Sequence, residues 1–247
     1  MTSYTDELLK LLALEYNCSP DDFRRSENVL TVPALLEGRR QYSPDKYFFS
    51  MVTLGGNAVV TADEQLHPFL TDLFGRVKGH WVFELHSLIE IERELSKYGF
   101  TLTQTHHMFL PCRHTEPKAG FPVKWFTGGD IHRFYGDKRF PNAICPRFQP
   151  ERPDRIVVCA FDGDDIIGMA GCSEDAPHWQ QIGIDVMPEH RSQGVGKYLV
   201  TLLKNRIEEL GDIPFYGTAV ANYHSWNIAI SCGFRPTWVE IEAKKIQ

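Results

Sequence analysis

The chain has 247 residues and a formal net charge of −6 at pH 7. Its apolar content of 43% is close to the globular average and excludes long disordered stretches. The negative charge offers no basic surface for DNA or RNA, and no apolar run approaches the length of a membrane-spanning helix. The composition therefore predicts a protein with neither a nucleic acid nor a membrane as partner.

The six cysteines are scattered and form no Cys-x-x-Cys pair. The first residues lack the apolar core and cleavage site of a secretory leader, so we expect reduced thiols and a cytoplasmic protein. Cys112 and His114 form a metal-like pair, but no second pair at ligand spacing accompanies them. We therefore expect no metal site.

The first 110 residues predict a small α/β domain, because apolar residues at helical spacing alternate with strand and turn signals. Ser19-Pro20-Asp21-Asp22 is a typical helix start, and Thr61-x-x-Glu64 is a second capping candidate. Gly55-Gly56-Asn57 indicates a hairpin turn. The expected elements are helices at 5–16 and 85–98, strands at 47–54 and 58–61, and a strand at 100–110 after Gly99.

Pro111–Pro122 has the proline and glycine content of a boundary, so it predicts a linker. On this basis the chain divides into an N-terminal domain at 1–115 and a second domain at 123–247. The elements expected in the second domain are strands at 123–126, 155–161, 165–170, 180–187, 215–220 and 237–241, a helical turn at 131–135, and a helix at 198–210 that Gly211 ends.

Gln180–Gly211 is the stretch most typical of a ligand site. Ile182, Ile184 and Val186 alternate with Gly183 and Asp185 as in a strand with one buried face, and Pro188 ends it. A glycine loop then leads into a helix. Such a loop leaves backbone N–H groups unpaired at the positive end of the helix dipole. The sequence therefore predicts an anion site, for a phosphate or diphosphate.

Two well-known phosphate loops are excluded by single residues. A Walker loop requires glycine where this chain has Arg191, and serine or threonine where it has Tyr198. A dinucleotide-binding loop requires a third small residue where this chain has Leu199.

Val186-x-Pro188-Glu189-x-Arg191-x-x-Gly194-x-Gly196 resembles the acetyl-CoA-binding motif of the GNAT N-acetyltransferase superfamily. Asn222, Ser225, Ile228 and Gly233-Phe234 match that family's C-terminal signature. The resemblance covers about residues 123–247. It implies an α/β (α+β) fold with a mixed, mostly antiparallel sheet flanked by helices, preceded here by the smaller α/β domain. Ser225–Phe234 is similar to the ending of bacterial members with an extra N-terminal part.

The helix followed by Tyr98-Gly99-Phe100 and a strand echoes the helix followed by Cys232-Gly233-Phe234 and a strand. One hypothesis is that the N-terminal half is a degenerate copy of the second half of the GNAT fold without the phosphate loop. The alternative is two unrelated units that each use glycine as a helix stop.

The resemblance implies acetyl-CoA as co-substrate and a small-molecule primary amine as acceptor. It also implies that backbone groups of the strand lie beside the pantetheine arm and that the loop holds the diphosphate, where Gly194 and Gly196 leave room for close approach. The residues implied in cofactor binding are Ile184, Asp185, Val186, Arg191, Ser192, Gln193, Gly194, Val195, Gly196, Lys197, Asn222 and Ser225.

The sequence departs from the family where an acid and a base are expected, because Ala229 replaces a frequent tyrosine and Gly217 a frequent acidic residue. The substitutes that we expect for the base or amine-binding group are Asp185 and Glu174. The substitutes that we expect to return a proton to the departing thiolate are Tyr223 and His224. Each also has a structural interpretation: Asp185 holding a turn, Glu174 solvated, and His224 capping the final helix.

Two further hypotheses remain open. A non-catalytic acyl-CoA-binding or regulatory module would keep the cofactor loop and lose the acid and base. Alternatively, the N-terminal helices form a protein-interaction surface. A homodimer is a separate prediction.

Overall fold

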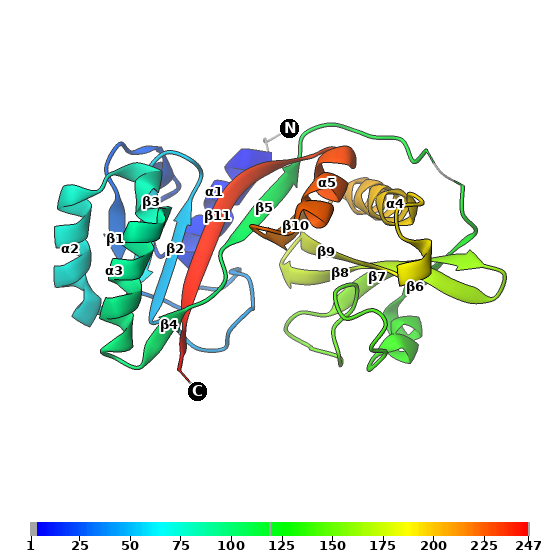
Figure 1. Cartoon of the computed structure of the whole chain (residues 1–247), viewed down its shortest axis with the longest axis horizontal. Helices are drawn as coiled ribbons and strands as arrows, with labels where there is room; N and C mark the ends of the chain where they lie inside the picture. Colours follow the sequence, from blue (N-terminus) through cyan, green and yellow to red (C-terminus); the bar gives the residue numbers. More distant parts are fainter. Residues whose placement is uncertain (1–3, 119, 247) are drawn as a thin grey trace. The chain divides into compact units, whose positions relative to one another are not determined.

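The computed structural model describes residues 4–118 and 120–246, which divide into two compact units (Figure 1). The first unit contains the residues up to Met108 together with those from Thr237 onward, and the second runs from Phe109 to Pro236. The chain passes from one unit to the other within β5 (His106–Pro111) and again within β11 (Phe234–Lys245). The first unit is therefore discontinuous in sequence.

The sheet of the first unit has the order β1-β3-β2-β11, and β4 also pairs with β11. β1 and β3 are parallel, and the other pairs are antiparallel. Its elements before β5 are α1 (Tyr4–Glu15), η1 (Pro20–Arg24), β1 (Val29–Thr31), β2 (Phe49–Thr53), β3 (Ala58–Ala62), η2 (Glu64–Leu66), α2 (His67–Arg76), η3 (Gly79–Phe83), α3 (Leu85–Ser96) and β4 (Phe100–Leu102).

Helices cover both faces of this sheet. α2 and α3 lie on one face, where Leu70 and Ile91 pack in one buried cluster with Met51 (Figure 1). α1 belongs to the other face, because the Tyr16 hydroxyl that follows it lies 2.9 Å from the Ser50 hydroxyl, and Ser50 alternates with Met51 along β2. The strands of the first unit are therefore buried on both sides.

The sheet of the second unit has the order β10-β9-β8-β7-β6. β9 and β10 are parallel and the other pairs antiparallel. Its elements between β5 and β11 are β6 (Val123–Thr127), η4 (Gly128–Phe134), β7 (Asp154–Asp162), β8 (Asp165–Ala176), β9 (Trp179–Val186), η5 (Pro188–His190), α4 (Val195–Glu209), β10 (Ile213–Ala219) and α5 (Tyr223–Ser231).

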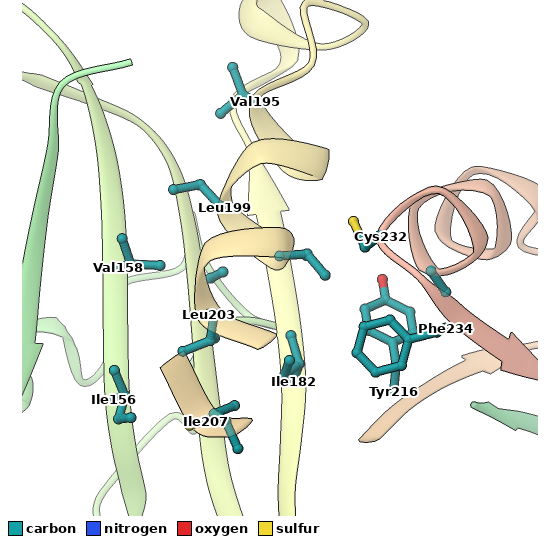
Figure 2. Close-up of a cluster of buried hydrophobic side chains, with 14 of the residues drawn as sticks. Ile156, Val158, Ile182, Val195, Leu199, Leu203, Ile207, Tyr216, Cys232 and Phe234 are labelled. Atoms are coloured by element: carbon teal, nitrogen blue, oxygen red, sulfur yellow. The ribbon is translucent and has the colours of Figure 1, made fainter. Parts of the chain in front are cut away.

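The core of the second unit forms where one face of this sheet meets α4. Leu199 and Leu203 project from α4 toward Val158 of β7, in a cluster that also holds Ile182 (Figure 2). On the opposite face the residues between β6 and β7 cover the sheet, with Phe140 packed in a second cluster (Figure 1). Alternate residues of β7 pack in the first and in the second cluster, because successive side chains of a strand point to opposite faces of the sheet.

The predicted fold class is confirmed: the protein is mixed α/β with a mostly antiparallel sheet flanked by helices. The helix start at Ser19 is also confirmed, because Ser19 caps η1; the Asp22 carboxylate in addition accepts from the Ser19 amide at 2.8 Å, which completes a capping box. No helix of the described residues is both long and apolar enough to cross a bilayer.

Three predicted boundaries were wrong. The strand expected at 100–110 is two strands, β4 and β5, separated by residues 103–105. Thr61 lies inside β3, and the cap before η2 is Asp63, whose carboxylate accepts from the Gln65 amide at 3.1 Å. α4 begins at Val195 rather than at 198.

The beginning of the predicted linker is docked on the second unit. The Cys112 amide donates to the Gly233 carbonyl at 2.9 Å, the Thr115 hydroxyl donates to the Cys232 carbonyl at 2.7 Å, and Lys204 of α4 donates to the Arg113 carbonyl at 3.2 Å. The domain limits 1–115 and 123–247 stay predictions, as does the relation of the N-terminal half to the GNAT fold.

Gly99 and Gly233 both follow a helix in the left-handed region, with φ of 78° and 88°. Their surroundings differ. A Cβ on Gly99 would meet nothing within 4 Å, whereas a Cβ on Gly233 would overlap the Arg113 carbonyl oxygen. Gly233 is therefore required twice, for its backbone angle and for the docking of the segment after β5.

We expect Gly233→Ala to lower the free energy of unfolding more than Gly99→Ala does. Both variants place a non-glycine residue in the left-handed region, at about 1–2 kcal/mol. Only Gly233→Ala adds overpacking of about 1–3 kcal/mol. Urea unfolding of the two single variants measures the difference, and equal losses would contradict the docking role of Gly233.

Candidate functional site

β9 and β10 pair along only part of their length. The parallel ladder runs from Trp179 beside Ile213 to Ile182 beside Tyr216, and β9 then continues to Val186 outside it. On its other edge β9 stays paired with β8 as far as Val186. One edge of the last four residues of β9 therefore presents backbone N–H and C=O groups that β10 does not use.

The loop after β9 ends in two left-handed residues, Ser192 with φ of 62° and Gly194 with φ of 89°. Gly194 is the N-cap of α4 and supplies no side-chain acceptor. The amides of the first turn of α4 have no intrahelical acceptor, and the helix dipole adds partial positive charge at the same place. The loop and the first turn of α4 are thus suited to an anion.

Two side chains of the loop fold back onto its own backbone. Arg191 Nε donates to the Val186 carbonyl at 3.3 Å, and Gln193 Nε2 donates to the Glu189 carbonyl at 3.1 Å. These contacts close the loop between the end of β9 and α4.

The open edge of β9 and the amide loop line one pocket of about 500 Å³. Every predicted cofactor-binding residue except Gln193 lines the pocket, together with three residues that were not predicted to bind the cofactor. The predicted residues that line it are Ile184, Asp185, Val186, Arg191, Ser192, Gly194, Val195, Gly196, Lys197, Asn222 and Ser225; the others are His190, His224 and Ile228.

Both loop glycines have structural roles, and the predicted room for the phosphate stays a prediction. A Cβ on Gly194 would meet nothing within 4 Å, so its left-handed φ is what requires glycine. A Cβ on Gly196 would come within 3.3 Å of the Val186 and Ile228 side chains. Gly196 therefore allows α4 to pack closely on β9 and α5.

Asp185 projects to the face of the sheet opposite α4 and holds a loop there. Its carboxylate accepts from the Asn142 amide at 2.7 Å, from Asn142 Nδ2 at 2.6 Å and from the Ala143 amide at 2.9 Å. A Cβ on either of two paired glycines, Gly171 and Gly183, would overlap the backbone of this loop. Three accepted hydrogen bonds favour the turn-holding interpretation of Asp185 over that of a free base.

The structure does not bring Glu174 to the pocket. It pairs with Gln180 in the β8–β9 ladder, five residues from Asp185, which is about 17 Å along a strand. Its carboxylate lies 3.4 Å from Arg155. The solvated, ion-paired interpretation of Glu174 fits this position.

Tyr223 and His224 lie at the start of α5 with different surroundings. Tyr223 is 71% exposed and does not line the pocket, whereas His224 does. The cap of α5 is Asn222, whose side chain accepts from the Ser225 amide at 3.2 Å. His224 therefore does not have the predicted capping role.

Tyr216 was not predicted as a site residue. It is buried at the last rung of the β9–β10 ladder, and its hydroxyl lies 2.6 Å from the Ser225 hydroxyl. Burial raises the pKa of the Tyr216 phenol to about 12. Tyr216 differs from an ordinary core residue only in its position at the end of the β9–β10 ladder. The sequence does not show where that ladder ends.

Arg191 and Lys197 place positive charge beside the amide loop, and both side chains are exposed. Among residues 4–118 and 120–246, no group of three or more His, Cys, Asp or Glu side chains is arranged to bind a metal ion.

Residues 121–234 match the model of the acetyltransferase (GNAT) family. A GCN5-related N-acetyltransferase from Kribbella flavida is similar along 100% of this chain and 97% of its own, with a TM-score of 0.51 at 10% identity. A GCN5-related N-acetyltransferase-like protein from Streptococcus suis matches 65% of this chain and 69% of its own, with a TM-score of 0.46 at 12% identity.

A third structure, a Bacillus anthracis protein in complex with acetyl coenzyme A, matches 41% of this chain and 66% of its own, with a TM-score of 0.32 at 20% identity. No curated protein matches the sequence at a significant level. The Kribbella flavida structure is thus similar to this chain in fold over its whole length.

We expect Asp185→Asn to lower the free energy of unfolding by about 2 kcal/mol, since hydrogen bonds to a charged group contribute about 1.5–3 kcal/mol and an amide cannot accept from all three donors. Asp165→Asn, on an exposed position at the start of β8, is the control and should change stability little. Urea unfolding compares the two. A stable Asp185→Asn variant whose turnover falls about 10²–10⁴-fold would instead indicate a general base.

Proposed function

The chain carries a domain of the acetyltransferase (GNAT) family over residues 121–234, and from this premise we propose that it is an acetyl-CoA-dependent N-acyltransferase acting on a small primary amine. The observation that carries the proposal is the continuity of the open edge of β9 with the uncapped first turn of α4 in one pocket. An extended chain that ends in a diphosphate is complementary to this combination.

Coenzyme A fits both parts of the pocket. The amide loop and the first turn of α4 would hold the diphosphate, with Lys197 and Arg191 adding charge from the solvent side. The pantetheine arm carries amide groups, and it would bind the open edge of Ile184–Val186 as one strand binds another. Asn222 and Ser225 would line the opposite wall.

Transfer by direct attack in a ternary complex makes three demands on the protein. The acceptor must be a neutral amine, the oxyanion of the tetrahedral intermediate must be stabilised, and the departing sulfur must be stabilised as negative charge develops on it. Backbone N–H groups at the open edge of β9 are suited to the oxyanion. Two imidazoles line the pocket, those of His190 and His224, and His224 is the proposed group for proton exchange with solvent.

The proposal gives Asp185 a positioning role and no catalytic role to Glu174 or Tyr223. Asp185 would hold Asn142 and Ala143 on the face of the sheet opposite α4. Glu174 lies too far along the strand, and the Tyr223 side chain is mostly in solvent.

A second candidate function is a non-catalytic acyl-CoA-binding module. The observation that favours it is Ala229, which is fully buried and offers no hydroxyl where many family members have a tyrosine. Gly217 likewise provides no carboxylate on β10.

The location and assembly of the protein remain proposals. The six cysteines are all free, which supports a reducing cytoplasm, and the likeness of Ser225–Phe234 to bacterial members supports a bacterial source. A homodimer stays a prediction, as does a protein-interaction surface on the N-terminal helices.

We expect Gly194→Ala to weaken acetyl-CoA binding at least about tenfold, because a change of φ would turn the first amides of α4 away from the diphosphate, and one charge-assisted hydrogen bond contributes about 1.5–3 kcal/mol. The control is Gly211→Ala at the other end of α4. Its φ is 84° and a Cβ there also meets nothing within 4 Å, so the backbone strain is matched. Titration calorimetry that gives both variants the same affinity would contradict the loop assignment.

A second measurement separates the two candidate functions. We expect the protein to release free CoA from acetyl-CoA in the presence of at least one class among polyamines, aminoglycosides and amino acids, measured with a thiol reagent. Tight binding of acetyl-CoA without release on any of these amines favours the binding module.

A further inference from the structure

We propose that Ser225 is the group that stabilises the departing thiolate of coenzyme A, and that Tyr216 is a positioning residue that orients the Ser225 hydroxyl. This inference rests on the proposed function. It assigns a donor for the sulfur in a chain whose Ala229 offers no hydroxyl at the position of α5 where many family members have a tyrosine.

The position of the pair follows from the ladder. Tyr216 is the last residue of β10 that pairs with β9, so its ring lies at the point where the two strands part. Figure 2 shows this ring in the core of the second unit beside Phe234 and Cys232, with its oxygen on the side of α5. Ser225 of α5 lies between that oxygen and the pocket, because it contacts the first and lines the second.

The direction of the hydrogen bond follows from burial. The Tyr216 side chain is 2% exposed, and Ser225 is the partner that its hydroxyl has at 2.6 Å. A buried O–H group donates to the acceptor that it has, since an unmade bond costs the full desolvation of the donor. Tyr216 therefore donates and Ser225 Oγ accepts, which leaves the serine proton free to point toward the pocket.

In the pocket, this proton lies where the sulfur end of bound coenzyme A is expected. With the diphosphate at the first turn of α4, the pantetheine arm passes Val186 and then Ile184 on its way to the point where the strands part. The sulfur at the end of the arm arrives beside Ser225. The Val186 and Ile228 side chains lie beside Gly196 in this pocket, each within 3.3 Å of where a Cβ on Gly196 would be.

The chemical role is stabilisation by a donated hydrogen bond. When the tetrahedral intermediate collapses, the C–S bond breaks, the electron pair stays on sulfur, and the C=O bond re-forms. The Ser225 O–H donates to the resulting thiolate, while the donation from Tyr216 polarises that O–H. The proton that the amine loses and the proton that the thiolate later gains are exchanged with water, so neither hydroxyl is ionised.

The test uses CoA itself and requires no knowledge of the acceptor. A hydrogen bond to the thiolate lowers the pKa of the bound CoA thiol, which a pH titration of the thiolate ultraviolet absorbance measures in the full-length protein. We expect Ser225→Ala to raise that pKa by about one unit, equivalent to ~1.4 kcal/mol. Ser225→Thr keeps the hydroxyl and should preserve the wild-type value.

Tyr216→Phe should raise the same pKa by a smaller amount. The double variant should give no more than Ser225→Ala alone, because Tyr216 acts through Ser225. Two controls remove matched hydroxyls outside the pocket: Ser231→Ala on the same helix, whose hydroxyl donates to the Ile228 carbonyl at 3.0 Å, and Tyr198→Phe on α4. Neither should change the thiol pKa.

The outcomes separate the inference from the proposed function. Normal CoA affinity with an unchanged thiol pKa in Ser225→Ala overturns the role of Ser225 and leaves the proposed function intact. Additive shifts in the double variant overturn the role of Tyr216 as a positioning residue. If the wild-type protein does not bind CoA, the proposed function and this inference both fail. If the Ser225→Ala variant does not fold, the thiol pKa is measured in the Tyr216→Phe and Ser225→Thr variants instead.

Discussion

The parting of β9 from β10 is the constraint on which the candidate site depends. Parallel strands satisfy each other's backbone groups only while they stay about 4.8 Å apart. Here the ladder stops at Ile182 and Tyr216, although both strands continue. The Val186 carbonyl accepts from Arg191 Nε at 3.3 Å, and the pocket provides space for a partner of the other freed groups. At the end of β9 the chain must turn, and the glycine loop makes this turn. α4 then covers one face of the sheet.

Two sets of polar contacts flank this parting. On one face the Asp185 carboxylate holds Asn142 and Ala143, and the paired glycines Gly171 and Gly183 let that backbone lie directly on the sheet. On the other face α5 begins at its Asn222 cap, and Ser225 meets Tyr216. The open edge is therefore supported by groups that are already hydrogen-bonded. Preorganisation of this kind lets a site act without first paying to order itself.

The sequence was most informative where chemistry and local conformation coincide. The glycine loop, the strand before it and the leucine stripe of α4 are local patterns that predicted an anion site. The resemblance to the GNAT motifs implied the pocket residues apart from His190, Ile228 and His224, and His224 was expected in proton transfer. The partners of Asp185 lie more than forty residues away in an irregular segment, and no local pattern indicates that a carboxylate will face two backbone amides there. In the sequence, Tyr216 has only the features of an ordinary aromatic residue in a β-strand. Its importance comes from the register of two strands, which is a property of the folded chain.

The return of β11 to the first unit has a consequence for biosynthesis. Residues 50–53 of β2 pair with residues 239–242, so that edge of the first sheet stays open while the intervening chain is being translated. The second unit emerges from the ribosome in one continuous stretch and has its sequence complete earlier. An exposed strand edge can recruit other chains, so the nascent first unit is the part most in need of chaperone protection.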